Sequence, residues 1–442
     1  MSDIPLSYTI AVQGFRFRVR EIEGSEELSK PFRIHAWFAL DHQTMVGVPD
    51  EFDPDDIVKQ DATVILERDG AVQRQIKGIV SEVELSATIS GVPEVNMIIE
   101  PRFSILRHRH DVRIHRNMTV PEIVTEVCEA LGVKIDNRLT SAYDSRPYCV
   151  QWRETDFDYC NRLLEDEGIF YFFTQDDVMV LGDAPDAYDA GPTLLFRSAA
   201  GVNQHDDAIH EIGTRASLSP GKVTLRDWNT EHPSLDMDVS HETAMPFSCE
   251  WYDYPGEYEE PGEGARKARL HAEAFDRAHA ATKGKTTCGL LAPGIVFKVV
   301  DTPMGAEDGG FVTRKIVHRW HENDHHYEVA FEADQENITY RPPRETFVPR
   351  IFNPMTGFVV MEHPGQDIHC DHFGRVKIHF PWDRIQPKDA NCSHWIPTIQ
   401  DNTGGSSAIP REGWEMMVHF LEGDPDRPVV LGKCAAVAQP VR

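Results

Sequence analysis

The sequence lacks the features that would place it in a membrane or mark it for export. Its best apolar stretch, residues 288–300, is interrupted by Pro293, Gly294 and Lys298, so no run approaches the roughly 18 apolar residues of a membrane-spanning helix. The N-terminus begins Met1-Ser2-Asp3 and continues into alternating polar and apolar residues, without the basic region and apolar core of a signal peptide. We therefore expect no stable membrane anchoring and no signal-peptide export.

Basic residues are also scarce. The chain of 442 residues has 44 lysines and arginines against 72 aspartates and glutamates, a net charge of −28. Nucleic-acid binding depends on cationic side chains that displace phosphate counterions, so this balance argues against DNA or RNA as a partner. Residues 351–442 carry 8 basic and 11 acidic residues, a net of −3, and residues 1–350 hold the remaining −25. The two parts are expected to have different roles.

Cysteines and the common catalytic signatures give no support for a cofactor or enzyme site. The 8 cysteines form no Cys-x-x-Cys pair and have no zinc-finger spacing, and they are too sparse for a disulfide scaffold. We expect reduced, buried thiols in a cytoplasmic fold. The sequence has no Gly-x-Ser-x-Gly elbow, Walker A sequence or Gly-x-Gly-x-x-Gly motif. No cofactor and no enzymatic activity are therefore expected.

Histidine is the metal-ligating residue type that the sequence has in quantity, with 21 copies. The densest group, at positions 318–326, is followed by two more at 369 and 372. A spacing of three in a strand places His318 and His321 on opposite faces, and His325 and His326 are neighbours in an expected turn. Zinc needs ligands that converge on one point. We therefore predict solvated turn and edge-strand histidines, with a metal site at 318–326 as the alternative.

The first hundred residues have the alternation of half-buried strands. Apolar and polar residues alternate at 33–38, where Ile34, Ala36 and Phe38 share one face, and a glycine divides a similar pattern at 7–19. The same alternation recurs at 63–67, 75–84 and 95–99. The pattern predicts a β-barrel or a β-sandwich over residues 1–105.

The spacing of apolar residues becomes helical after about residue 106. Thr119 and Glu122 form a capping box, apolar residues follow at helical spacing as far as Leu131, and Gly132 is suited to end the helix. A second helix is predicted at 155–168, followed directly by the strand 169–173. These elements predict an α/β insert over residues 106–200.

Strand patterns return in the following segment. They occur at 222–227, 295–300, 311–320 and 326–332, and an alanine-rich helical stretch at 265–283 interrupts them. We expect a second β-barrel with an inserted helix over residues 201–340. The first 349 residues would form one larger domain from these three parts.

A proline-rich connector separates this domain from the C-terminal part. Pro342, Pro343, Pro349 and Pro354 fall within thirteen residues, which predicts an extended, semi-rigid segment. Short alternating strands follow at 375–380, 414–420 and 429–431. They predict a small OB-type barrel over residues 350–442.

Several segments together resemble the VgrG spike proteins of bacterial type VI secretion systems. Residues 371–384 are similar to the family's D-x-x-G-R-V-K-V-x-F-x-W-D-R run, 408–413 to its A-I-P-R-x-G and 420–428 to its F-x-x-G-D-P-D-R-P. Segments at 117–124, 154–159, 162–169, 252–256 and 331–333 match in the same order. The matched positions to which we assign a structural role are Gly374, Arg375, Val376, Lys377, Phe380, Trp382, Asp383, Arg384, Pro410, Gly413, Gly423, Asp424, Pro425, Asp426 and Pro428.

The resemblance implies a tail hub of two β-barrels with an α/β insert, followed by an OB-fold neck. Such a protein is a non-enzymatic trimer that caps the Hcp tube, carries a PAAR tip and effectors, and is fired from the cytoplasm into a neighbouring cell without a signal peptide. VgrG proteins normally continue into a trimeric β-helix, and no such repeat follows this barrel. We therefore expect a form without the β-helix, either a piece of a longer chain or a short-spiked form.

Three alternatives remain open. The chain could be the tail hub of a related contractile phage or injection particle, or a spike with hydrolase activity. The OB-type barrel alone would also fit a nucleic-acid binder, against which the charge argues.

Overall fold

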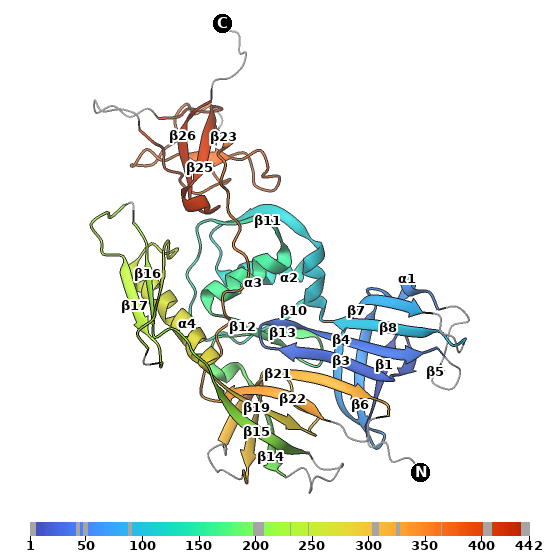
Figure 1. The fold of residues 1–442 in the computed structure, drawn as a ribbon. Helices are drawn as coiled ribbons and strands as arrows, with labels where there is room; N and C mark the ends of the chain where they lie inside the picture. Colours follow the sequence, from blue (N-terminus) through green and yellow to red (C-terminus); the bar gives the residue numbers. More distant parts are fainter. Residues whose placement is uncertain are drawn as a thin grey trace. The chain divides into compact units, whose positions relative to one another are not determined.

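The structure is a computed structural model, shown as a ribbon in Figure 1. It describes residues 6–40, 45–46, 52–86, 91–197, 207–229, 231–245, 247–302, 309–323, 328–363, 365–400 and 409–434. These residues form mostly strands with a few helices between them, which confirms the expected mainly β fold with an α/β insert. Within these ranges, no helix is long and apolar enough to span a membrane.

One long sheet dominates the first part of the chain. Its strands, in spatial order, are β20 (Ile295–Val300), β14 (Asp189–Phe196), β15 (Ala208–Ala216), β19 (Ala280–Thr286), β22 (Val329–Gln335), β21 (Gly309–His321), β3 (Glu21–Glu27), β4 (Lys30–Ala39), β8 (Glu94–Glu100), β7 (Ala71–Ser86), β6 (Asp61–Arg68), β1 (Leu6–Val12), β2 (Phe15–Arg18) and β5 (Met45–Val46). A short helix, α1 (Pro54–Ile57), precedes β6.

Part of this sheet closes on itself. Strand β20 pairs with β14 on one side and with β21 on the other, so β20, β14, β15, β19, β22 and β21 form a closed six-stranded barrel. Because the ring is closed, each of these six strands is paired with a neighbouring strand on both sides. The barrel takes its first strand, β14, from residues expected in the α/β insert.

The barrel continues into the strands of the first hundred residues. Strands β21 and β3 pair antiparallel at seven positions, from Lys315 opposite Glu27 to His321 opposite Glu21. The two sets of strands therefore share one hydrogen-bonded sheet. At Gly24, in the middle of β3, a side-chain Cβ would lie 2.5 Å from the carbonyl oxygen of Arg33, so this position has no room for a side chain.

The alternating apolar residues make the core of this sheet. Ile34, Ala36 and Phe38 are buried along β4, as the alternation predicts, and Phe38 stacks on Phe17 at a centroid distance of 4.7 Å. Burying each large apolar side chain is worth about 1.5–3 kcal/mol. The alternation therefore sets which face of each strand points inward.

The two helices of the α/β insert lie where the spacing predicted them. Helix α2 (Val120–Glu129) begins with the predicted capping box, in which the Thr119 N–H donates to the Glu122 carboxylate at 2.8 Å. Gly132 follows with φ +75°. Helix α3 (Asp156–Glu167) leads into β12 (Phe170–Phe173).

The remaining elements of this region are four strands and two 3-10 helices. They are β9 (His110–His115), β10 (Lys134–Asn137), β11 (Cys149–Thr155), β13 (Val178–Gly182), η1 (Arg102–His108) and η2 (Pro185–Ala187).

These strands make two small sheets. Strands β10, β13 and β12 form one, and β9 pairs antiparallel with β11 to form a two-stranded ribbon. The ribbon contains a register shift between Trp152 and Glu154, which marks a bulge and increases the local twist.

A separate three-stranded sheet is inserted between β15 and β19. Its order is β17 (Asp238–Glu242), β16 (Lys222–Arg226) and β18 (Glu250–Asp253), and it packs on α4 (Pro261–His279) (Figure 1). The prediction that residues 222–227 belong to the second barrel is therefore wrong. The predicted helix also ends too late, because Ala280–Thr286 pairs with β15 and β22 as β19.

The C-terminal part is a four-stranded antiparallel sheet with its own core. Its order is β24 (Lys377–His379), β23 (Met355–Val360), β25 (Glu415–Phe420) and β26 (Pro428–Lys433), with the 3-10 helix η4 (Leu421–Gly423) between the last two. The proline-rich residues 342–354 contain neither helix nor strand, as predicted.

The chain divides into two compact units. The first combines residues 1–105, 128–141 and 164–344, and the second combines 106–127, 142–163 and 345–442. The C-terminal sheet and the β9–β11 ribbon therefore belong to one unit. The domain boundaries expected after residues 105, 200 and 349 remain predictions.

Candidate functional site

The motif residues begin with a tight turn in front of β24. The Asp371 carboxylate accepts hydrogen bonds from the N–H of Phe373 at 3.0 Å, from the N–H of Arg375 at 2.9 Å and from Arg375 Nε at 2.5 Å. Burial alone would raise the pKa of Asp371, but these bonds and the Arg375 charge lower it. Gly374 has φ +77°, a conformation that favours glycine. The turn fixes where β24 begins.

Val376 and Lys377 carry the chain from this turn into β24. Val376 exchanges two main-chain hydrogen bonds with Ile396, at 3.0 and 2.8 Å. The buried Lys377 ammonium donates to the Ser393 carbonyl oxygen at 2.8 Å. Burial, with repulsion from Arg116, lowers the pKa of Lys377 to about 8. Lys377 therefore holds neighbouring chain segments together inside the unit.

The aromatic and acidic residues after β24 fill the core and end the strand. Phe380 is fully buried and stacks on Trp382, with centroids 5.1 Å apart and an interplanar angle of 14°. The carboxylate of Asp383 accepts hydrogen bonds from the N–H groups of Ile385 and Gln386, both at 3.0 Å. The F-x-W-D part of the motif is thus a core anchor followed by a side-chain-stabilised turn.

The later motif segments are also turns. Pro410 is buried, and Gly413, with φ +71°, donates its N–H to the Val359 carbonyl oxygen at 3.0 Å. Gly423 has φ +75° and its carbonyl oxygen accepts from the Ile351 N–H at 2.7 Å. Both glycines occupy the left-handed region that other residues adopt at a cost.

The G-D-P-D-R-P segment joins β25 to β26. Asp424 accepts the N–H of Asp426 on its carboxylate at 2.9 Å and the N–H of Arg427 on its carbonyl oxygen at 3.0 Å. Pro425 and Pro428 are buried, and Pro428 is the first residue of β26. The segment is a hydrogen-bonded turn between paired strands.

Motif residues also contact the β9–β11 ribbon within the same unit. The Trp382 ring lies edge-on to Trp152 of β11, with centroids 5.4 Å apart and an angle of 70°. The exposed Arg384 donates to the Asp111 carboxylate of β9 at 2.9 Å. The motif thus combines a barrel core with a surface that holds the ribbon.

Asp426 makes a further contact of this kind. Its carboxylate accepts the Val150 N–H at 2.6 Å. Burial and the neighbouring Asp424 raise the pKa of Asp426, against the opposing charge of Arg162. The sequence offered no sign of the ribbon residues Val150, Trp152 and Asp111, because nothing in their spacing predicts contact with a segment more than 200 residues away.

One of the described histidines, His318, departs from the prediction. His318 is buried, and its Nε2 lies 2.8 Å from Glu26 Oε1, so the prediction of a solvated histidine is wrong there. His321 is half-buried, and His325 and His326 lie outside the described residues. The ring of His369 packs on Trp395, and His372 is exposed. In the ranges that the structure describes, no three His, Cys, Asp or Glu side chains are grouped to hold a metal ion.

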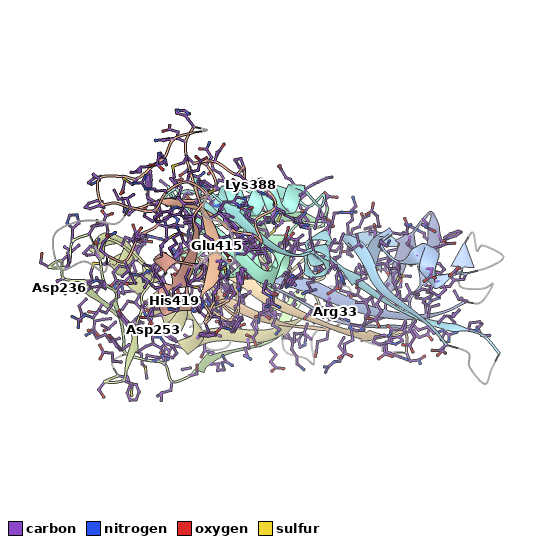
Figure 2. The ribbon with its side chains drawn as sticks, turned by 90° about the horizontal axis from the view of Figure 1, so that it is seen from above. Arg33, Asp236, Asp253, Lys388, Glu415 and His419 are labelled. Atoms are coloured by element: carbon purple, nitrogen blue, oxygen red, sulfur yellow. The ribbon has the colours of Figure 1, made fainter. Side chains whose placement is uncertain are left out.

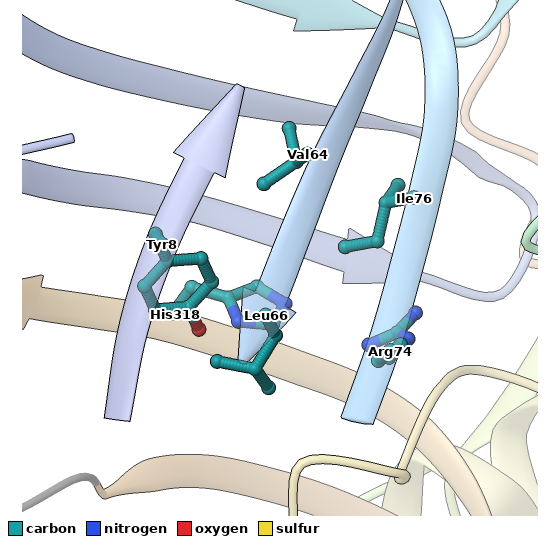
Figure 3. Close-up of a pocket in the computed structure, with 6 residues that line it drawn as sticks. All are labelled: Tyr8, Val64, Leu66, Arg74, Ile76 and His318. Atoms are coloured by element: carbon teal, nitrogen blue, oxygen red, sulfur yellow. The ribbon is translucent and has the colours of Figure 1, made fainter. Parts of the chain in front are cut away.

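The partners of His318 form a buried ionic cluster. Arg74 on β7 donates to Glu26 Oε2 at 2.6 Å, whereas His318 contacts Oε1. Burial raises the pKa of Glu26, but the charges and hydrogen bonds of Arg74 and His318 lower it to about 2. Figure 3 shows the small cavity at this point, lined by Tyr8, Val64, Leu66, Arg74, Ile76 and His318. Apart from Arg74 and His318 of the cluster itself, the cavity is lined by apolar and aromatic side chains, which indicates a structural cluster within the sheet.

The cysteines differ from one another in burial. All eight are free, but the expectation that they are buried is wrong for Cys249, which is exposed, and Cys370 and Cys434 are half-buried. Burial raises the pKa of Cys149 and Cys288 to about 11, which keeps both thiols protonated at neutral pH.

Two families of known sequences match this chain. The phage tail baseplate hub (GPD) family matches residues 25–324, which contain most of the strands of the long sheet and the whole three-stranded insert. The injector OB domain of type VI secretion systems and phage baseplates matches residues 363–434. The second match confirms the OB-type fold of the C-terminal sheet.

Curated relatives extend this similarity to nearly the whole chain. The type VI secretion system spike protein VgrG1a of Pseudomonas aeruginosa is 30% identical over 448 residues, covering 96% of this chain and 68% of that protein. VgrG1b of the same organism is 29% identical, and the chain spans 59% of its length. This chain thus spans about three fifths to two thirds of these relatives.

A solved structure shows the same fold. An Escherichia coli component of the type VI secretion system, itself similar to the T4 bacteriophage tail proteins gp27 and gp5, superposes with a TM-score of 0.71 at 22% identity. The match covers 96% of this chain and 99% of that chain. The hub match over more than half of the residues, together with the spike relatives, shows that the chain belongs to the phage tail baseplate hub family, in its VgrG type VI secretion spike branch.

Proposed function

We propose that this chain is the structural hub and neck of a type VI secretion spike, assembled as a homotrimer that caps the Hcp tube. The observation that carries this proposal is the order of the two family matches, a baseplate hub over residues 25–324 and an injector OB domain over 363–434, within one chain. The spike is assembled in the cytoplasm and then delivered out of the cell. A PAAR tip and effectors would join it where a shaft follows the neck.

A structural, non-enzymatic role is supported by how the motif residues are used. The carboxylates of Asp371, Asp383 and Asp426 accept main-chain N–H groups of their own unit. These carboxylates are used to hold turns and strands in place, which is the use expected in a structural part. The motif therefore supports a rigid part of an assembly.

Self-association is supported by apolar side chains on the connector. Phe347 and Phe352 are 79% and 78% exposed, on either side of the buried Ile351. Exposed aromatic side chains are enriched at interaction sites. A cyclic trimer would present this segment to its neighbours three times and remove six phenylalanines from water.

Charge opposes this assembly. Each chain brings −28, so a trimer gathers −84, and like charges repel over a distance set by salt. The screening length falls from about 30 Å at 0.01 M salt to about 8 Å at 0.15 M. Apolar contacts would supply the affinity between chains. Salt would screen the repulsion between them and so determine how strongly the trimer forms.

Light scattering at micromolar concentration tests the proposal. The measured mass is expected to rise from one 50.1 kDa chain toward three as salt increases from 0.01 to 0.15 M. The double variant Phe347→Ser/Phe352→Ser is expected to need at least tenfold more protein to trimerise. A matched control, Leu218→Ser, removes another exposed apolar side chain and is expected to trimerise as the parent does. A mass of one chain at every salt concentration would contradict self-assembly of this hub.

A further inference from the structure

The three-stranded insert has an open edge. Strand β18 pairs only with β16 among the described strands, and all four of its residues, Glu250–Asp253, are exposed. An edge strand of this kind presents N–H and C=O groups that a further strand can pair with. Proteins usually blunt such edges with proline or with charged side chains, especially lysine. Strand β18 contains no lysine or proline, and its two charged residues, Glu250 and Asp253, are acidic. Its main chain is therefore suited to strand addition.

Aromatic side chains flank this edge on both faces. Trp251, Tyr252 and Tyr254 are 48%, 56% and 48% exposed. Trp251 is in register with the buried Val223, so it lies on the α4 face of the sheet, where its ring is 5.4 Å from Phe275. The next residue, Tyr252, points to the opposite face because side chains alternate along a strand. A strand added beside β18 would meet an aromatic ring on each of its faces.

The charge around this edge selects the partner. Residues 222–260 contain ten acidic and two basic residues, a net of −8, and the net is still −7 when α4 is included. Figure 2 labels two of the acidic residues, Asp236 and Asp253. Glu250 on β18 already pairs with Lys222 at 3.3 Å. A second copy of this acidic surface would be repelled, whereas a cationic chain would be attracted.

We propose that β18 is a docking edge for an extended, basic segment of a partner protein, which adds as a strand beside β18. Apolar side chains on one face of the segment contact Trp251, and lysines or arginines on its other face lie over the Tyr252 ring and near the acidic loops of the insert. Main-chain pairing supplies affinity, and the two aromatic rings and the surrounding charge supply selectivity. Docking of this segment on β18 does not depend on self-assembly of the chain through the connector.

A synthetic peptide tests this inference on the full chain. The probe is a labelled ten-residue peptide that alternates lysine and valine, and the matched probe replaces each lysine with glutamate. Fluorescence anisotropy is expected to show saturable binding of one lysine peptide per chain and at least tenfold weaker binding of the glutamate peptide. Binding is expected to weaken as salt increases.

Uncharged variants separate this site from general attraction to an acidic protein. Tyr252→Ala and the double variant Trp251→Ala/Tyr252→Ala leave the net charge unchanged, and each is expected to weaken lysine-peptide binding, the double variant by tenfold or more. The control Phe373→Ala, in the other compact unit, is expected to bind as the parent does. Thermal unfolding of each variant checks that the fold is kept, and Tyr252 is the safer change because Trp251 contacts Phe275. Equal binding by parent and double variant would overturn the proposal.

A second probe tests strand pairing directly. A lysine–valine peptide methylated at every main-chain nitrogen has no N–H groups to donate, and it is expected to lose binding. If it binds as well as the unmodified peptide, the mode is not strand addition. Light scattering on Trp251→Ala/Tyr252→Ala gives the remaining control, because loss of the trimer in this variant would assign β18 to contact between copies and contradict a basic partner.

Discussion

Glu26 remains ionised inside the sheet because a cationic group contacts one of its carboxylate oxygens and a ring nitrogen contacts the other. Removing a carboxylate from water costs far more than one hydrogen bond returns. Arg74 Nη2 lies 2.6 Å from one carboxylate oxygen and His318 Nε2 lies 2.8 Å from the other. Because the pKa of Glu26 is lowered from 4.5 to about 2, the folded state binds fewer protons than the unfolded state between those values.

This difference predicts an acid-sensitive contribution to stability. A carboxyl group whose pKa is depressed on folding stabilises the fold above its unfolded pKa, and the contribution is lost as pH falls from about 4.5 toward 2. A shift of this size corresponds to about 3 kcal/mol. In chemical denaturation, Glu26→Gln is expected to lower the free energy of unfolding by about that amount at pH 6, and the gap to the parent is expected to shrink at pH 3.

The control for this measurement is Glu84→Gln, on the same strand as Arg74. Glu84 is exposed, so its substitution is expected to change the free energy of unfolding by less than about 0.5 kcal/mol at either pH. A gap between Glu26→Gln and the parent that is equally large at pH 6 and pH 3 would mean that the charge of Glu26 is not what stabilises the sheet.

At the scale of elements, the pairing of β21 with β3 depends on a position without a side chain. Gly24 lies opposite His318 on one side and Ile34 on the other. A Cβ there would lie 2.5 Å from Arg33 O and 2.9 Å from Ile34 Cα, and main-chain atoms cannot move aside cheaply. Gly24→Ala is therefore expected to lower the free energy of unfolding by about 1–3 kcal/mol.

The matched control is Gly213→Ala in β15. This glycine also lies within the long sheet, but a Cβ there would meet nothing within 4 Å. The change is expected to be neutral or slightly stabilising, by up to about 1 kcal/mol, because alanine restricts the unfolded chain. Equal losses for the two alanine variants in thermal unfolding would show that strand propensity, and not the close approach at Gly24, determines the effect.

The elements that could be predicted are those with local causes. Alternation located β4, β6 and β8, and the Thr119 capping box located α2, because both patterns act over a few residues. The end of α4 was missed because residues 280–283 (Ala-Ala-Thr-Lys) favour a helix locally, whereas pairing with β15 and β22 makes them a strand. The seam between β21 and β3 joins residues almost 300 positions apart, and no local pattern specifies that pairing.

The candidate site divides in the same way. The turns at Gly374, Gly413 and Gly423 could be predicted as turns, since glycine supplies the positive φ that each requires. The contacts of Trp382 and Asp426 with the ribbon could not, because they depend on which face the ribbon presents. His318 was misjudged for a related reason: alternation separates it from His321 but does not say which of the two meets Glu26.

At the scale of the whole molecule, the connector joins two units that are interleaved in sequence. Trypsin is expected to cut the parent near Arg344 or Arg350, where residues 344, 345 and 347 are exposed and regular structure is absent. The C-terminal fragment should remain bound after cleavage, because its unit also contains residues 106–127 and 142–163. Two bands on a denaturing gel and one peak in size exclusion are the expected result.

The variant Trp382→Ala tests why the fragments stay together. It removes the ring that packs on Trp152, and the C-terminal fragment is then expected to separate from the nicked protein in part. First cleavage within residues 119–170, with the connector intact, would place the boundary elsewhere.

The seam between β21 and β3 has a consequence for how the protein is made. Lys315 is synthesised 288 residues after its partner Glu27. At about 5–20 residues per second this delay lasts about 15–60 s. Throughout it, the nascent chain holds β3 with one edge unpaired, and Glu26 has Arg74 but not His318 beside it. An open strand edge on a ribosome-bound chain is a template for wrong pairing with neighbouring copies. Translation speed and chaperone supply, more than the stability of the finished sheet, would then set the yield of folded protein.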